Sequence, residues 1–173
     1  MDPCGYGAKV SAENGLPQGR FEGPTEFAQL IRMAFATAAT QGWREIIICD
    51  STFEDWPLGE RTVAESLNEW AKSGRKLTML AKNYSEVTRR HARFVTWRRR
   101  WAHIIECRAM TAVSPDDVPS ALWSLQWVFQ RVDLVRSTGF SGIEATRRIA
   151  LKEKLDEFQK RSTSAFAATT LGL

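Results

Sequence analysis

Apolar residues between positions 24 and 108 switch repeatedly between a helical spacing and short continuous runs. The helical spacing gives each helix one apolar stripe, and short β-branched runs are typical of buried strands. The pattern predicts six alternating elements: helices at 24–41, 59–73 and 83–100, and strands at 44–49, 76–81 and 103–108. Because strands joined through a helix pair in parallel, we expect 46–49 and 77–80 to be parallel neighbours.

The pattern changes after residue 115, where aromatic and β-branched residues dominate. Residues 121–125 and 127–133 predict two further strands that would pair as a hairpin, with a helix over the same stretch as the alternative. Ser141 is a suitable N-cap for a last helix that ends near residue 161. The expected fold is therefore α/β, with a mixed, largely parallel sheet and helices packed on it.

The length of 173 residues corresponds to one domain, and 43% hydrophobic residues are enough for a packed core. Residues 1–23 contain five glycines and two prolines but few apolar side chains, which predicts a flexible N-terminal arm. Residues 24–161 then form a single α/β domain, and residues 162–173 form a C-terminal tail. This composition excludes a disordered chain and a collagen-like repeat.

The sequence contains neither an apolar run of membrane-spanning length nor the pattern of a secretion signal. Its three cysteines, Cys4, Cys49 and Cys107, are widely spaced. Such spacing favours a reducing compartment over a disulfide framework or a zinc site. We therefore expect a cytoplasmic protein without a membrane partner.

Charge is unevenly distributed along the chain. Residues 82–108 hold eight basic and two acidic side chains, whereas residues 50–69 hold six acidic and one basic. A basic surface of this kind attracts phosphate groups, nucleic acid or acidic partners. The alternative is that the two segments lie side by side in the fold and neutralise each other, since consecutive elements are usually spatial neighbours.

The clearest candidate for chemistry is Asp50, which follows the first buried strand, where open parallel sheets place their ligand sites. Haloacid-dehalogenase-like phosphatases end this strand in Asp-x-Asp, but Thr52 occupies the second acidic position here. A magnesium site formed by Asp50, Glu54 and Asp55 is conceivable, although solvated charges are the commoner outcome. No nucleophile elbow or phosphate-binding loop is present in the sequence. The sequence therefore argues against an enzyme and predicts no metal site and no cofactor.

The predicted helix 83–100 is rich in arginine. At 100° per residue Arg89, Arg93 and Arg100 form one stripe, which could bind an anionic ligand or nucleic acid. Arg90 falls inside the apolar arc, where it would reach out to solvent, form an ion pair or anchor a ligand. His91 is expected at the edge of this helix, and His103 is expected to be a structural residue at the start of a strand.

Three segments carry a family resemblance: Asp50 with 56–61 (Trp-Pro-Leu-Gly-Glu-Arg), 89–91 (Arg-Arg-His) and 101–108 (Trp-x-His-Ile-x-Glu-Cys-Arg). Together they resemble an uncharacterised proteobacterial domain family that occurs alone or fused to acetyltransferase domains. The resemblance covers residues 24–160, and the family's element order is similar to one half of a phospholipase-D-like fold. Phospholipase D enzymes use a His-x-Lys motif, which this chain lacks. The resemblance thus implies the fold and not the reaction.

These observations favour a non-catalytic α/β binding or regulatory domain. The first alternative is binding of nucleic acid or a phosphate ligand through helix 83–100, and the second is an enzyme with an unrecognised site at the carboxyl ends of the strands. The candidate ligand-binding residues are Asp50, Asp55, Trp56, Glu60, Arg61, Arg89, Arg90, His91, His103 and Arg131.

Assembly is a separate expectation. A phospholipase-D-like half normally packs against a second half, and the aromatic residues 123–129 hold more apolar surface than an exposed strand pair leaves in water. We therefore expect a homodimer that buries part of this segment, because a symmetric pair is the commonest closed assembly.

Overall fold

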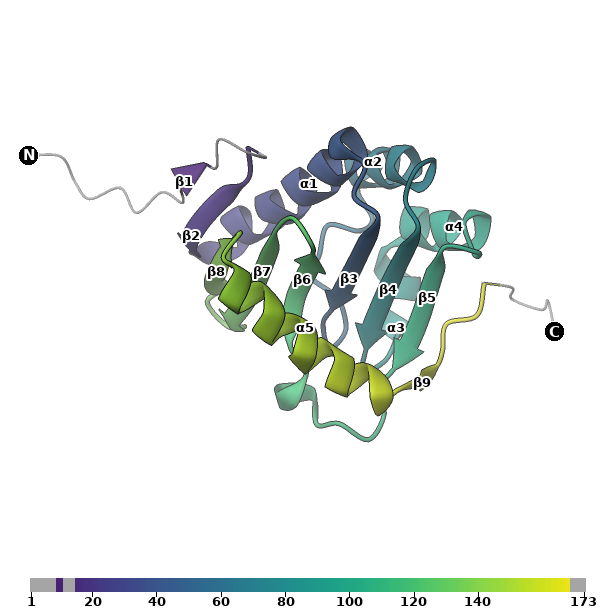
Figure 1. The fold of residues 1–173 in the computed structure, drawn as a ribbon. Helices are drawn as coiled ribbons and strands as arrows, with labels where there is room; N and C mark the ends of the chain where they lie inside the picture. The colour runs from purple at the N-terminus through teal and green to yellow at the C-terminus, as the bar shows by residue number, and fades with distance from the viewer. Residues whose placement is uncertain (1–8, 11–14, 169–173) are drawn as a thin grey trace, which may run out of the picture.

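A computed structural model describes residues 9–10 and 15–168 of the chain (Figure 1). Its strands form one sheet in the order β1-β2-β8-β7-β6-β3-β4-β5-β9. The strands are β1 (Lys9–Val10), β2 (Pro17–Phe21), β3 (Glu45–Cys49), β4 (Lys76–Ala81), β5 (Ile105–Ala109), β6 (Ser120–Ser124), β7 (Val128–Asp133), β8 (Thr138–Gly142) and β9 (Thr163–Ser164).

Helices cover both faces of this sheet. One face packs against α1 (Gly23–Gln41), α2 (Arg61–Ala71), α3 (Ser85–Arg90) and α4 (Ala92–Arg100), and α5 (Ala145–Lys160) crosses the other (Figure 1). A short 3-10 turn, Pro115–Asp117, precedes β6. A large hydrophobic core lies beneath α1 to α4, and a smaller one lies beneath α5. None of the helices in the described part of the chain is long and apolar enough to cross a membrane.

The predicted parallel pair is confirmed, because β3 and β4 align in parallel with Ile46 opposite Leu77. β5 adds a third parallel strand beside β4. The expectation of a largely parallel sheet is wrong, since the other six neighbouring pairs are antiparallel. For the pairs β6–β7 and β7–β8 the reason is connectivity, because short turns join these strands and permit only antiparallel neighbours.

The hairpin over 121–133 is confirmed as β6 and β7, and the alternative helix is wrong. Ser141 does not cap the last helix, because it lies inside β8, and α5 begins at Ala145. The sequence pattern did not predict β8, because glycine and serine, which make up most of this strand, are not typical strand residues. Its Gly139 is required by close packing, since a Cβ there would lie 2.0 Å from the carbonyl oxygen of Gln130 on β7.

The predicted helix 83–100 is interrupted at His91, whose backbone angles leave the helical region (φ −119°, ψ 56°). The interruption changes which arginine faces the core. Arg90 is exposed and pairs with Glu86, so its expected place in an apolar arc is wrong. Arg98 is buried instead.

Both ends of the described chain join the sheet. β2, within the segment expected to be a flexible arm, pairs with β8 and buries Phe21. Residues 1–8 and 11–14 lie outside the described residues. At the other end, β9 pairs with β5 through Thr163 and Ser164.

The aromatic residues that suggested a dimer are covered by the chain itself. Trp123 lies beneath α5, where its indole Nε1 donates to the carbonyl of Arg148 at 3.0 Å. Trp127 is fully buried and donates to the carbonyl of Pro17 at 2.9 Å, and Phe129 is fully buried as well. The apolar surface from which the interface was inferred is therefore largely buried inside one molecule, and the homodimer itself stays a prediction.

Candidate anion-binding pocket

Three of the predicted site residues meet at the carboxyl end of β3. Arg131 on β7 donates from Nη2 to Asp50 at 3.1 Å and binds both carboxylate oxygens of Asp55. Its Nε donates to Ser120 at 3.1 Å, and its guanidinium lies 4.0 Å from the ring of Phe27. Every nitrogen of this arginine is used within the chain. The cluster thus ties the end of β3 to β7, which is a structural task.

The loop after Asp50 is held in one conformation by backbone contacts. Asp50 accepts hydrogen bonds from the amides of Thr52 and Phe53, at 3.2 and 2.8 Å. Phe53 has a positive φ of 59°, and its carbonyl accepts a hydrogen bond from Nε2 of His91 at 2.7 Å. Trp56 packs in the aromatic cluster beside Phe53. His91 and Trp56 are therefore both buried and help to hold this loop, and a role for them in ligand binding stays a prediction.

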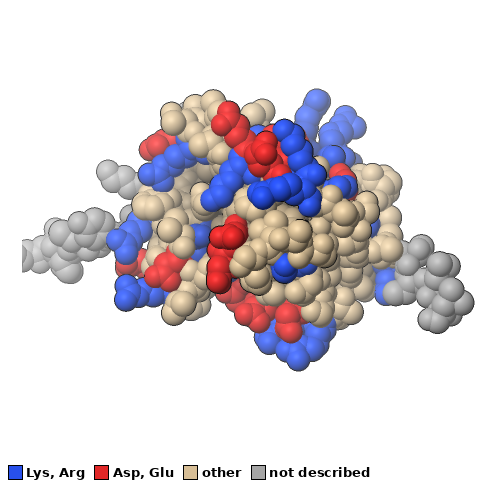
Figure 2. Space-filling model, turned by 90° about the horizontal axis from the view of Figure 1, so that it is seen from below, with Lys and Arg blue, Asp and Glu red and all other residues tan. Residues whose placement is uncertain are grey.

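The remaining predicted residues on α2 and α3 lie apart from this cluster. Glu60 pairs with Arg32, which lowers the pKa of the Glu60 carboxyl. Arg61 pairs with Glu65, and Arg89 and Arg90 share Glu86. The acidic segment 50–69 and the basic segment 82–108 lie side by side, since α2 packs against α4, but in the described chain no ion pair joins them. Figure 2, viewed from the carboxyl ends of β3 to β5, shows acidic and basic side chains interspersed.

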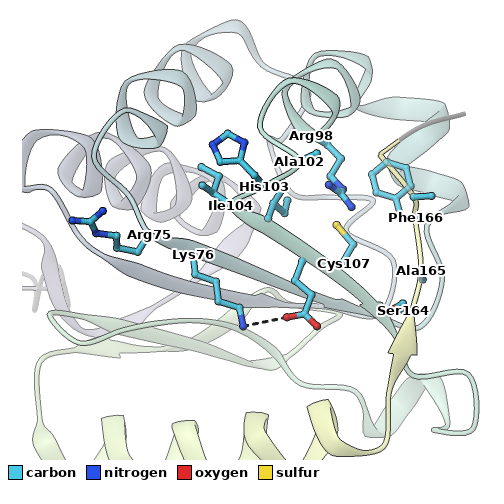
Figure 3. Close-up of a pocket in the computed structure, with 13 residues that line it drawn as sticks. Arg75, Lys76, Arg98, Ala102, His103, Ile104, Cys107, Ser164, Ala165 and Phe166 are labelled. Atoms are coloured by element: carbon cyan, nitrogen blue, oxygen red, sulfur yellow. Dashed lines mark ion pairs between the residues drawn. The ribbon is translucent and has the colours of Figure 1, made fainter.

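A pocket of about 640 Å³ lies at the opposite end, where β4 and β5 begin. Its walls are the last turn of α4, the strand β5 and the chain after β9 (Figure 3). The lining residues are Arg75, Lys76, Arg98, Ala102, His103, Ile104, Ile105, Glu106, Cys107, Ser164, Ala165, Phe166 and Ala167. Of the ten predicted site residues, His103 alone is among them.

Arg98 is the distinctive residue of this pocket. It is 7% exposed, and its Nε and Nη1 atoms have no hydrogen-bond partner among the described residues. Its guanidinium points to the space between Cys107 and Phe166 (Figure 3). Burying a charge without a counter-charge costs several kcal/mol. Arg98 therefore marks the place in the described chain where an anion has most to contribute.

Other charges in the pocket are predominantly positive. Lys76 pairs with Glu106 at 3.1 Å, and Glu106 also pairs with Arg108 at 2.9 Å. These two cations lower the pKa of the Glu106 carboxyl and hold its charge. Arg75 and His103 lie farther along the pocket (Figure 3). Glu106, the one acidic residue of the lining, is thus already paired, and the lining as a whole carries more positive than negative charge.

Cys107 does not provide a nucleophile. Burial raises the pKa of its thiol to about 12, although nearby Arg98 acts in the opposite direction. Nucleophilic attack needs the thiolate, which is scarce at neutral pH when the pKa is this high. Cys107 is therefore not an activated nucleophile, and the pocket combines cationic side chains and the imidazole of His103 with apolar groups.

Sequence reasoning missed Arg98 and the pocket for identifiable reasons. Arg98 follows Phe94 by four residues, which places both on the same face of α4, and Phe94 is fully buried. This spacing was a usable signal, but a continuous helix 83–100 directed attention to Arg89, Arg93 and Arg100. Lys76 and residues 164–167 carry no motif. Only the fold brings them to the edge of β5.

Comparison with known proteins yields no matching family model and no matching curated relative. Among solved structures the chain is similar to TrmBL2, described as an archaeal chromatin protein with a novel mode of DNA binding. The two share 14% sequence identity with a TM-score of 0.58, over 86% of this chain and 54% of TrmBL2. This chain thus spans about half the length of TrmBL2. The similarity shows a shared α/β fold.

Proposed function

We propose that this protein is a non-catalytic α/β binding domain that takes a small anionic ligand in the pocket of Arg98. The carrying observation is the buried guanidinium of Arg98, two of whose nitrogens lack a partner among the described residues. Hydrogen bonds between an arginine and a carboxylate or phosphate are stronger than neutral ones. A bound anion would therefore supply the counter-charge that Arg98 lacks among the described residues. Lys76 and Arg75 would add electrostatic attraction for the anion.

The apolar part of the lining limits the kind of anion. Ile104, Ala165 and Phe166 border the same space as the cations. A ligand with a charged group and a small apolar body would satisfy both parts of the lining. The resemblance to half of a phospholipase-D-like fold concerns architecture alone in this proposal, because the chain has no His-x-Lys motif.

To test the pocket, the isotope-labelled chain is titrated with inorganic phosphate and with acetate, and binding is monitored by NMR. We expect backbone resonances of Arg98, Cys107 and Lys76 to shift in a saturable way with at least one of the two anions. In Arg98→Met the affinity should fall about tenfold or more, the value of a charge-assisted hydrogen bond.

Arg99→Met is the matched control, because Arg99 is the exposed neighbour of Arg98 on α4. It removes the same charge and should leave the affinity nearly unchanged. An equal loss in both variants would mean that net charge, and not this pocket, attracts the anion. Saturable binding to neither anion would contradict the proposal.

A second candidate function is nucleic-acid binding through α4. Arg93, Arg99 and Arg100 are exposed and form no ion pair within the described chain. Arg93 donates to the carbonyl of Gly59 at 2.9 Å, and Arg100 stacks on Trp101 at 5.6 Å. The other support for this candidate is the shared fold with TrmBL2, which is described as having a novel mode of DNA binding.

Salt dependence separates the two candidates. If α4 binds duplex DNA, log K should fall linearly with log salt, with a slope of about −0.9 per phosphate contacted. The double variant Arg99→Gln with Arg100→Gln should then make the slope shallower by the value of about two phosphate contacts. Arg61→Gln should leave the slope unchanged, because the Arg61 guanidinium already pairs with Glu65. Absence of DNA binding at about 50 mM salt would remove this candidate.

A further inference from the structure

Residues 164–167 form one wall of the pocket and are held to the domain by a small number of contacts. Ser164, Ala165, Phe166 and Ala167 line the cavity. β9 contributes only two residues to the sheet, opposite Arg108 and Ala109. We name residues 163–167 the closing segment.

The contacts of the closing segment are specific and few. The amide of Ala165 donates to the carbonyl of Cys107 at 3.0 Å. Phe166 stacks on Tyr84, with ring centroids 5.0 Å apart and planes at 1°. Phe166 also has a positive φ of 49°, a conformation that L-residues rarely adopt and that costs free energy. Just before the segment, Arg108 holds Ser162 through two hydrogen bonds of 2.6 and 2.8 Å.

The closing segment and Arg98 oppose each other energetically while the pocket is empty. Phe166 and Cys107 flank the guanidinium of Arg98 (Figure 3), so docking of the segment contributes to its removal from water. Docking therefore carries the cost of burying a charge that has no counter-ion. An anion beside Arg98 would remove that cost and contact the segment at the same time.

We propose that anion binding in the Arg98 pocket and docking of the closing segment are coupled with positive sign, so that the segment reports whether the pocket is occupied. This inference rests on the proposed function. Because coupling is reciprocal, docking of the segment must raise the affinity for the anion by the same factor by which the bound anion raises the docking equilibrium constant. The readout of this domain is then the order of the closing segment.

Hydrogen exchange on the full-length chain, with and without inorganic phosphate, measures the coupling. Where phosphate binds, we expect the amides of residues 163–167, above all Ala165, to exchange at about one fifth of their phosphate-free rate or slower. Amides of β7, on the other half of the sheet, serve as the internal control and should not change.

Two variants separate coupling from simple contact. In Arg98→Met the buried charge is gone, so the segment should be protected without phosphate and insensitive to its addition. Phe166→Ala loosens the segment and leaves Arg98 intact, so phosphate affinity should fall, by no more than the factor by which phosphate raises docking in the wild type. Both variants are compared with Arg99→Met.

The outcomes are distinguishable. Arg98-dependent phosphate binding with unchanged or faster exchange at 163–167 overturns the coupling and leaves the proposed function standing. An Arg98→Met chain whose segment is less protected than in the wild type also overturns it, since the charge would then be holding the segment in place. Absence of any anion binding overturns both proposals together.

Discussion

Gly139→Ala is expected to be among the most destabilising single substitutions in this chain, lowering the free energy of unfolding by about 3 kcal/mol or more. Gly139 lies on β8 between β7 and β2. A Cβ at this position would lie 2.0 Å from the carbonyl oxygen of Gln130, and 2.8 Å from both the Cα of Arg131 and the ring of Phe21. Two of these three contacts are backbone atoms, which cannot move without separating β7 from β8.

Gly142→Ala is the matched control for this prediction, because it lies on the same strand and its added Cβ would meet nothing within 4 Å. Urea unfolding followed by tryptophan fluorescence measures both variants. We expect the urea midpoint to fall strongly for Gly139→Ala, whereas for Gly142→Ala the free energy of unfolding should stay within about a few tenths of a kcal/mol of wild type. Similar midpoints for the two variants would refute the close packing of β8.

Arg131→Met is expected to lower the free energy of unfolding by about 3–5 kcal/mol. The Arg131 and Asp50 side chains are 3% and 7% exposed, so the substitution leaves a buried carboxylate without its counter-charge. The contacts to Ser120 and the stacking on Phe27 are lost as well. Asp50 also accepts a hydrogen bond from the amide of Phe53, so displacement of Asp50 would weaken the contact that holds Phe53 at its positive φ.

Comparison with Asp55 shows whether burial is the cause. The Asp55 side chain is 46% exposed, so Asp55→Asn should cost about 1 kcal/mol or less, although Asp55 binds the same arginine. The double variant Arg131→Met with Asp50→Asn should be more stable than Arg131→Met alone, because no unpaired charge remains. If Arg131→Met unfolds at the wild-type midpoint, the cluster is not the structural tie described above.

The Arg131 cluster also explains why the strongest candidate in the sequence did not become the site. Asp50 stands at the end of a buried parallel strand, as predicted, and that position is common for ligand contacts. Here β6 and β7 extend the sheet beside β3 and bring Arg131 to Asp50. The Asp50 carboxylate is therefore paired with Arg131, a residue 81 positions away in the chain.

Local patterns in the sequence were sufficient for the first half of the fold. The apolar stripe of α1, the continuous run of β3 and the strand β4 were predicted to within two residues, because burial on one stripe or on both faces constrains every residue of such an element. Parallel pairing of β3 with β4 followed from their helical connection. The hairpin of β6 and β7 likewise followed from aromatic and β-branched composition.

Tertiary structure alone decided the elements and residues that depend on distant neighbours. β8 is a strand because its glycine fits between two other strands, and β9 exists because the edge of β5 is free to pair. Arg98 is buried, and Arg90 is not, because His91 bonds to Phe53 and interrupts the helix between them. The sequence by itself determined which segments must be buried, since side-chain hydrophobicity is a local property. Which charge those segments would bury was decided by contacts between parts of the chain that no local pattern relates.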